Sequence, residues 1–111
     1  MAGKFVITKG KDDNYYFNLK AGNGEVILTS QGYNAKADCT NGIESVKKNS
    51  QSEGKFEVKK SNDGKDYFVL TATNGQTIGK SQMYKSESGC SNGMKSVTSS
   101  AADASVEDDS D

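Results

Sequence analysis

Short runs in which apolar and polar residues alternate recur along this chain, and two later stretches show a helical period instead. Alternation in residues 5–7 and 15–21 is the two-residue period of half-buried strands, and the Asn-Gly turn that follows predicts a third strand at residues 25–30. After residue 34, Cys39, Ile43 and Val46 follow one another at i, i+4 and i+7, which lines one face of a helix. The pattern therefore predicts three strands followed by a helix near residues 36–47.

The same pattern returns 51 residues later, so that residues 3–46 align with residues 54–97 without a gap. Self-similarity at a fixed offset is the signature of a duplication. The second copy predicts strands in residues 56–58, 66–72 and 76–81, with a turn at residues 61–65, and a helix near residues 87–98. Identical pairs include Phe5 and Phe56, Phe17 and Phe68, Leu19 and Leu70, Tyr33 and Tyr84, and Cys39 and Cys90.

Two of the glycine positions that both copies share are informative about the fold. Asn23-Gly24 and Asn74-Gly75 join the second strand to the third, and this dipeptide favours the type I′ turn of a tight hairpin. Gly42 and Gly93 fall inside the predicted helices, where glycine costs about 1 kcal/mol relative to alanine. Because both copies accept that cost, we expect each helix to approach the sheet closely.

Each repeat is thus a β-β-β-α unit, and one unit alone holds too few apolar side chains for a stable isolated domain. We predict an α+β fold in which two tandem repeats, residues 3–49 and 54–99, form a single domain over residues 1–99. The strands are expected to form one shared antiparallel sheet, with both helices on one face and a pseudo-twofold axis between the halves. Residues 100–111 are acidic and predict a flexible tail, with a short strand near Val106 as the alternative.

Four segments carry a family resemblance: Gly-Lys-Phe at 3–5, Tyr-Phe-Asn-Leu-Lys-Ala-Gly-Asn-Gly-Glu at 16–25, Ile-Leu-Thr-Ser-Gln-Gly-Tyr at 27–33 and Asn-Gly-Ile-Glu-Ser-Val at 41–46. They resemble the YegP-like family of small bacterial proteins, and the resemblance extends to about residue 98. It implies one joint sheet in which the strands after each helix are exchanged between units. The family has no characterised function, so the resemblance implies no catalytic residues.

Composition narrows the chemistry, because the 111 residues include no His, Arg, Trp or Pro, and all 14 basic residues are Lys. Without imidazole there is no Ser/His or Cys/His pair and no His-ligated metal site. A net charge of −1 gives no general attraction to nucleic acid or anionic lipid. No apolar run approaches the length of a membrane span, so we expect a cytoplasmic protein. Because the residue types of the common cofactor and metal sites are missing, we also expect no cofactor.

Three motifs resemble functional sites, and each has a simpler interpretation. Residues 74–81 nearly match a phosphate-binding loop, but Asn74 replaces its first glycine and the segment aligns with a hairpin strand. Residues 64–70 loosely resemble the aromatic strand of RNA-recognition domains, in the wrong order of elements. The turns at Asp12 and Asp63 lack the ligand number of a calcium loop.

Cys39 and Cys90 occupy equivalent helical positions, and two interpretations remain open for them. The first is two buried thiols that pack as small apolar groups. The second is a disulfide across the predicted axis, which requires Cα atoms within about 7 Å. The sequence does not contain the C-x-x-C motif of redox enzymes.

One surface suggests a binding role. If Phe17 and Leu19 face the helices, the neighbouring tyrosines face the other side of the sheet, which an antiparallel sheet can expose to water. The residues assigned to this candidate interaction surface are Tyr16, Tyr67, Val6, Val26, Leu28 and Val69. Several apolar residues on an open face are typical of a partner surface, although stabilising cross-strand pairs are the alternative.

These observations predict a non-enzymatic interaction or structural module that uses the open sheet face, with a protein or small molecule as partner. The alternative is a small-molecule or enzymatic site at the junction of the two repeats. Nucleic-acid binding through the lysines is the least favoured hypothesis. We expect a monomer that resembles a dimer internally, or a weak homodimer formed through edge strands.

Overall fold

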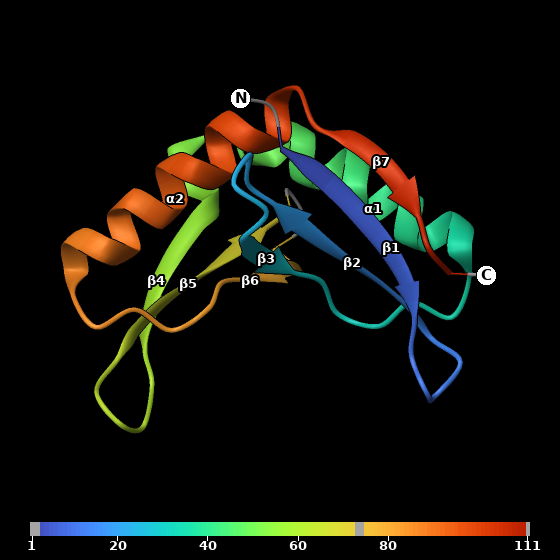
Figure 1. Ribbon diagram of the computed structural model, residues 1–111. Helices are drawn as coiled ribbons and strands as arrows, with labels where there is room; N and C mark the ends of the chain where they lie inside the picture. The colour runs from blue at the N-terminus through green and yellow to red at the C-terminus, as the bar shows by residue number, and fades with distance from the viewer. Residues whose placement is uncertain (1–2, 73–74, 111) are drawn as a thin grey trace.

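The computed structural model describes residues 3–72 and 75–110, in which seven strands and two α-helices follow one another (Figure 1). The first half holds β1 (Lys4–Lys9), β2 (Tyr15–Lys20), β3 (Val26–Thr29) and α1 (Lys36–Asn49). A short 3-10 helix (Glu53–Lys55) leads to β4 (Phe56–Lys60), β5 (Asp66–Thr71), β6 (Thr77–Lys80), α2 (Glu87–Ala102) and β7 (Ser105–Asp108). The predicted elements are therefore present in the predicted order.

The strands form one sheet in the order β4-β5-β6-β3-β2-β1-β7. Both helices lie over the same face of this arched sheet (Figure 1). The predicted α+β class, with two helices and one sheet, is confirmed. The prediction of an antiparallel sheet is wrong at one edge, because β7 runs parallel to β1 and makes the sheet mixed.

The C-terminal segment is ordered further than expected. Helix α2 continues to Ala102, and Ser105–Asp108 then pairs with β1 of the first half. Residues 100–102 thus end α2 and residues 105–108 form an edge strand, so the alternative of a short strand near Val106 describes this segment better than a flexible tail.

The two halves meet where β3 lies beside β6. Thr29 pairs with Lys80, its own equivalent at the 51-residue offset. One step away, Leu28 and Gly79 are also equivalent positions, but leucine has a large side chain and glycine has none. A Cβ atom on Gly79 would lie 2.7 Å from Cδ2 of Leu28. The missing side chain therefore makes the space that Leu28 fills.

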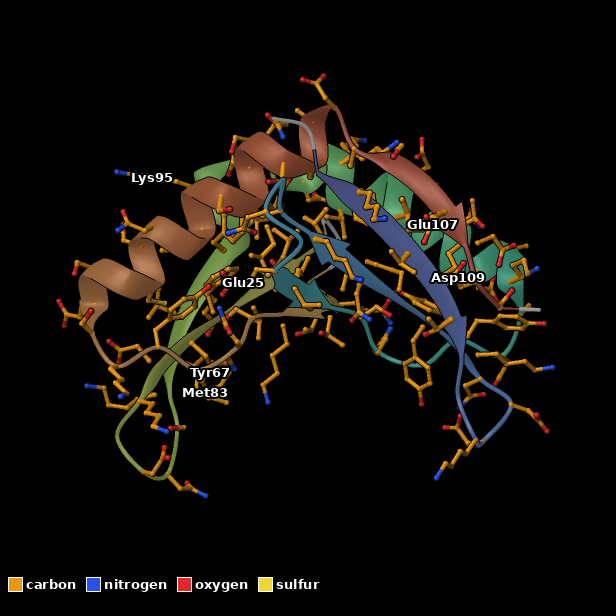
Figure 2. The ribbon with its side chains drawn as sticks, in the orientation of Figure 1. Glu25, Tyr67, Met83, Lys95, Glu107 and Asp109 are labelled. Carbon is orange, nitrogen blue, oxygen red and sulfur yellow. The ribbon has the colours of Figure 1, made fainter. Side chains whose placement is uncertain are left out.

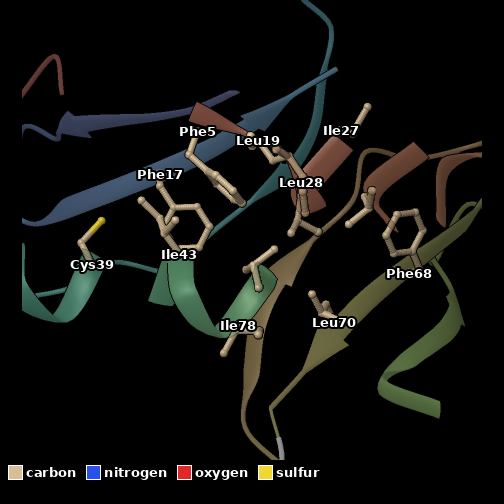
Figure 3. Close-up of a cluster of buried hydrophobic side chains, with 14 of the residues drawn as sticks. Phe5, Phe17, Leu19, Ile27, Leu28, Cys39, Ile43, Phe68, Leu70 and Ile78 are labelled. Carbon is tan, nitrogen blue, oxygen red and sulfur yellow. The ribbon is translucent and has the colours of Figure 1, made fainter. Parts of the chain in front are cut away.

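The core lies between the sheet and the helices and is continuous across both halves (Figure 3). Phe5 packs edge-on against Phe17 at a centroid distance of 5.7 Å, and Phe56 packs the same way against Phe68 at 5.5 Å. Full burial of one such side chain stabilises a fold by about 1.5–3 kcal/mol. Fully buried residues include Phe5, Phe17, Leu19, Leu28, Ile43, Val46, Phe68, Leu70 and Val97.

The helical glycines permit the close approach that the sequence predicts. A Cβ on Gly42 would lie 2.5 Å from the Tyr33 hydroxyl oxygen and 3.0 Å from the Phe17 ring. Gly93 has the same relation to Tyr84. The tyrosine rings stack on the core phenylalanines at 6.3 Å in each half. Each helix therefore rests on a tyrosine as well as on the sheet.

The hairpin between β2 and β3 forms, but its turn type differs from the prediction. Gly24 has φ +86°, whereas Asn23 does not share the positive φ that a type I′ turn needs at both central residues. The Gly24 amide donates to the Ala21 carbonyl at 2.9 Å, and the Ala21 amide donates to the Glu25 carbonyl. This is a three-residue loop closed by a left-handed glycine. Gly75 has φ +87° in the second half, while Asn74 lies outside the described residues.

Candidate functional site

The face of the sheet opposite the helices, called the concave face below, is open along its length (Figure 2). Direct strand pairing places one residue from each strand in a row across it. From β4 to β7 the row reads Glu57, Val69, Lys80, Thr29, Asn18, Val6 and Glu107. The concave face is thus mainly polar, with one valine in each half between longer polar side chains.

Of the four aliphatic residues assigned to this surface, only Val26 is well exposed, at 37%. Val6 and Val69 belong to the row on the concave face, but their neighbours cover them to 5% and 6% exposure. Leu28 lies in the core, so its assignment to the concave face is wrong. It pairs with the core residue Leu19, and a β-bulge next to this pair turns both Ile27 and Leu28 toward the helices.

The two tyrosines lie on the concave face in different settings. The Tyr16 hydroxyl donates to Oδ2 of Asp12 at 2.7 Å. This hydrogen bond lowers the pKa of the Asp12 carboxyl and raises the pKa of Tyr16. The Nζ atom of Lys80 lies 4.9 Å from the centroid of the Tyr67 ring, within the range of a cation-π contact. Each ring is therefore held by a charged neighbour and half-buried.

A shallow cavity of about 320 Å³ lies on the concave face where β3 meets β6. Its walls combine the edge of the hydrophobic core with hydroxyl, ammonium and amide groups. Nε2 of Gln82, one of the residues that line it, donates to Oε1 of Glu25 at 2.8 Å, which links the two halves. The lining residues are Val26, Leu28, Thr29, Ser30, Lys80, Ser81 and Gln82.

The repeated Ser-Gln pairs have a structural role that sequence reasoning missed. The Ser30 hydroxyl oxygen accepts from the Phe17 amide at 2.9 Å and donates to the Gln31 carbonyl at 2.8 Å. Ser81 makes the same two bonds, to the Phe68 amide and the Gln82 carbonyl. With its hydroxyl engaged twice at the end of a hairpin strand, Ser81 does not fit a phosphate-binding loop.

Both cysteines are free thiols buried in the core, and Figure 3 shows Cys39 at the edge of the buried cluster. Burial raises the pKa of Cys39 to about 11 and also raises the pKa of Cys90. A raised pKa keeps the thiol protonated and unreactive, because the thiolate is the nucleophile. The interpretation as buried apolar groups is the one this geometry supports.

We expect these thiols to make stability fall in alkaline solution. The unfolded chain loses the Cys39 proton near its ordinary pKa of 9.0, whereas the folded chain keeps it until about 11. The stabilising effect is present below pH 9.0 and is lost as pH rises through this window. Urea midpoints measured across it should fall less for Cys39→Ala than for the wild type. Equal falls of the urea midpoint with pH in the wild type and Cys39→Ala would contradict this prediction. Cys90→Ala is the matched control, and its difference from the wild type should be smaller than that of Cys39→Ala.

Within residues 3–72 and 75–110, no group of three or more His, Cys, Asp or Glu side chains could hold a metal ion. None of the described helices is long and apolar enough to cross a membrane.

Among the described residues, three large exposed hydrophobic side chains lie outside the predicted surface: Val58 on β4, Met83 after β6 and Val106 on β7. Val58 is 52% exposed, although its position in the strand pattern matches the buried Ile7. Alternation in the sequence reports which face a residue takes. Alternation does not indicate whether a strand lies at an uncovered edge of the sheet. The sequence therefore predicts Val58 only as an apolar residue of a half-buried strand.

Comparison with known proteins gives consistent results. The family described as "Domain of unknown function (DUF1508)" matches the chain twice, over residues 11–57 and 61–108. The UPF0339 protein PA0329 of Pseudomonas aeruginosa is 52% identical, with 99% of this chain and all of that protein covered. The UPF0339 protein YegP of Yersinia pestis is 43% identical over 96% of this chain and 95% of its own length.

Two solved structures have the same fold. The solution NMR structure of yegP from E. coli, titled a protein of unknown function, is 44% identical with a TM-score of 0.94. It covers 99% of this chain and 95% of its own. The solution NMR structure of the UPF0339 protein SO3888 from Shewanella oneidensis is also 44% identical, with a TM-score of 0.91. It covers 97% of this chain and 92% of its own.

Proposed function

The chain belongs to the DUF1508 family, a domain of unknown function, and we propose that it is a non-enzymatic interaction module that binds a protein partner on its concave face. The observation that carries this proposal is an open sheet face with a half-buried tyrosine in each half and a cavity of about 320 Å³ between them. Tyrosine suits such a surface because it offers a large rigid contact area and a polar tip.

The side chains with nucleophilic potential at this face support a binding role over an enzymatic one. The Ser30 and Ser81 hydroxyls are each engaged by two backbone groups, which fix the strand ends. The Asp12 carboxylate accepts a hydrogen bond from the Tyr16 hydroxyl, and its pKa is lowered. It therefore holds the tyrosine ring in place and is poorly suited to act as a general base near neutral pH.

We also infer that the two halves are related by a pseudo-twofold axis through the Thr29–Lys80 pair. The strand order supports this, because β6-β5-β4 and β3-β2-β1 follow one another outward from that pair in opposite directions. Strand β7 follows the helix of the second repeat and pairs with β1 of the first. Strand β4 is the first strand of the second repeat and pairs with β5 of that repeat, as β1 pairs with β2. The monomer would then be an internal dimer in which the C-terminal strand crosses to the other repeat.

Replacing Tyr16 and Tyr67 together with serine should abolish partner capture without unfolding the protein. Proteins retained by the immobilised wild type would be quantified by mass spectrometry against the double variant. The matched control is the double replacement by phenylalanine, which keeps both rings and should retain most of the binding. A partner list that is unchanged in the serine variant, while its circular dichroism stays native, would refute the role of this face.

The cavity between β3 and β6 supports a second candidate function, the binding of a small polar molecule at the junction of the repeats. Its lining offers the Lys80 ammonium and the Gln82 amide beside an apolar floor. Native mass spectrometry of the gently purified protein would detect a retained ligand. The replacement Thr29→Trp should displace such a ligand by filling the cavity, whereas the tyrosine variants should leave it bound.

A further inference from the structure

The second half of the molecule ends in a strand whose outer edge is open. Strand β7 covers the outer edge of β1, whereas within the described residues β4 has a strand neighbour, β5, on one side only (Figure 1). Ile7 on β1 is therefore 3% exposed, but its equivalent Val58 on β4 is 52% exposed. Two adjoining cavities of about 510 and 350 Å³ share Val58 and Met94 as walls. They form a groove between β4 and α2 on the helix side of the sheet, since Val58 pairs with the core residue Phe68.

The backbone of β4 offers hydrogen bonds along this open edge. In the first half, the Ile7 carbonyl points away from β2 and accepts from the Asp109 amide at 2.8 Å. Val58 is the equivalent of Ile7, and its partner Phe68 directs its own amide and carbonyl toward the β6 side. The Val58 amide and carbonyl therefore point outward, and so do those of the residues two positions before and after it. Such an edge is a template for pairing with another strand.

The charges on the concave side of β4 have both signs. Glu57 and Lys59 are two positions apart, and the carboxylate lies 3.9 Å from the ammonium. Both side chains are well exposed, at 62% and 45%. Opposite charges across a strand pair stabilise it and like charges destabilise it, so β4 selects the register of an added strand. The charged residues of β7, at the other edge of the sheet, are all acidic, so that edge cannot match itself.

A second copy of β4 fits this edge in the antiparallel register centred on Val58. Val58 then pairs with itself, and the outward backbone groups of the two strands meet. Each Glu57 stands opposite Lys59 of the second copy, so two identical ion pairs form on the concave side. These are non-hydrogen-bonded pairs, in which the Cα atoms are only about 4.5 Å apart. On the helix side, Lys60 of the second copy lies opposite Phe56, where its apolar stem covers the ring.

The neighbouring registers are disfavoured by charge. A shift that keeps apolar residues on one side must conserve the two-residue period of the strand. Centring the axis on Glu57 sets two carboxylates opposite each other, and centring it on Lys59 does the same with two ammonium groups. Each of these registers also pairs only three of the five residues of β4. In the register centred on Val58, Lys55 stands opposite Ser61, which adds no like-charge pair.

We propose that the protein forms a twofold-symmetric dimer in which β4 pairs antiparallel with β4 of a second copy, with Val58 at the axis. The two sheets become one continuous sheet, and the second copy lies against the mouth of the groove between β4 and α2. Because only five residues of each chain pair, the interface is small and the dimer is weak and reversible. It is separate from the tyrosines of the concave face and does not depend on the function proposed for them.

The first test is association as a function of protein concentration. Sedimentation velocity from about 1 μM to about 1 mM should show the wild-type protein shifting from the monomer toward the dimer. In the ¹⁵N-labelled protein, the amide resonances that move over the same range should belong to β4 and to the facing side of α2. Those of β7 should stay in place.

Charge exchange tests the register. Glu57→Lys and Lys59→Glu should each weaken association by about tenfold or more, since each sets like charges opposite each other. The double variant Glu57→Lys/Lys59→Glu restores the match and should associate as the wild type does. The two single variants, mixed in equal amounts, should dimerise with each other. Near 1 M salt, where the Debye length is about 3 Å, the differences should shrink.

A second pair of variants tests the place. Val58→Lys should abolish the dimer, because it sets two ammonium groups beside each other at the axis. Val106→Lys is the matched control on the opposite edge strand, where the valine is 46% exposed, and should leave association unchanged. Both positions are exposed, so circular dichroism should show a native fold for both variants.

Several results would overturn the proposal. One is a wild-type protein that is still monomeric at about 1 mM. Another is a double charge variant that associates as weakly as the single variants, which would exclude this register. Dissociation by Val106→Lys would show that β7 of one copy meets β4 of the next, in an open chain of copies. Dissociation by Tyr16→Ser/Tyr67→Ser would place the contact on the concave face instead.

Discussion

Replacing Leu28 with alanine is expected to lower the free energy of unfolding by about 2–5 kcal/mol, among the largest losses for any single substitution in this protein. Leu28 is fully buried at the centre of the sheet, where the two halves meet. Neighbouring atoms collapse poorly into a cavity at this place, since it is bounded by the backbone of two paired strands. Urea unfolding monitored by circular dichroism measures the loss.

The substitution Gly79→Leu tests the same contact from the other side. A Cβ there would lie 2.7 Å from Cδ2 of Leu28, so overpacking should cost about 1–3 kcal/mol. Exchanging the two residues, Leu28→Gly with Gly79→Leu, restores one large side chain and one space. We expect the double variant to be more stable than either single variant. Losses that simply add would show that the two positions do not share one space.

The substitution Phe5→Ala should lower the free energy of unfolding by about 3–5 kcal/mol. The loss for Phe56→Ala should be smaller by about 1 kcal/mol or more. The two rings are equivalent in the repeat and make the same edge-on contact, at 5.7 and 5.5 Å. They differ because β7 covers the flank of Phe5, whereas Phe56 borders the groove between β4 and α2. Equilibrium unfolding of both variants gives the comparison directly.

Removal of β7 provides the control for this pair. In a chain that ends at Asp103, Phe5 loses its cover, and the difference between the two alanine variants should become small. Equal losses in the full-length protein would contradict the interpretation, because burial by β7 would then contribute nothing measurable to Phe5.

The repeat made most of the fold predictable. Each strand and helix could be inferred twice from independent residues, so the 36–47 and 87–98 helices and the order of elements were predicted correctly. Gly42 and Gly93 likewise predicted close packing, although the neighbour that needs the space is a tyrosine ring as well as the sheet.

Features that depend on one residue of register, or on distant pairing, were not predictable. A bulge beside Leu19 moves Leu28 into the core, and strict alternation gives no sign of a bulge. The partner of β7 lies about a hundred residues away in sequence, so its parallel pairing with β1 leaves no local pattern. For the tyrosines of the candidate surface alternation is informative, because each is next to a phenylalanine of the core in sequence.

The contact between Leu28 and Gly79 shows a physical advantage of joining the two repeats in one chain. Two identical single-unit chains would bring the same residue to both sides of the junction, either two leucines that collide or two glycines that leave a hole. Covalent linkage of the copies guarantees one of each in every molecule. A single chain can therefore place a leucine and a glycine at equivalent positions of one junction, as Leu28 and Gly79 do here.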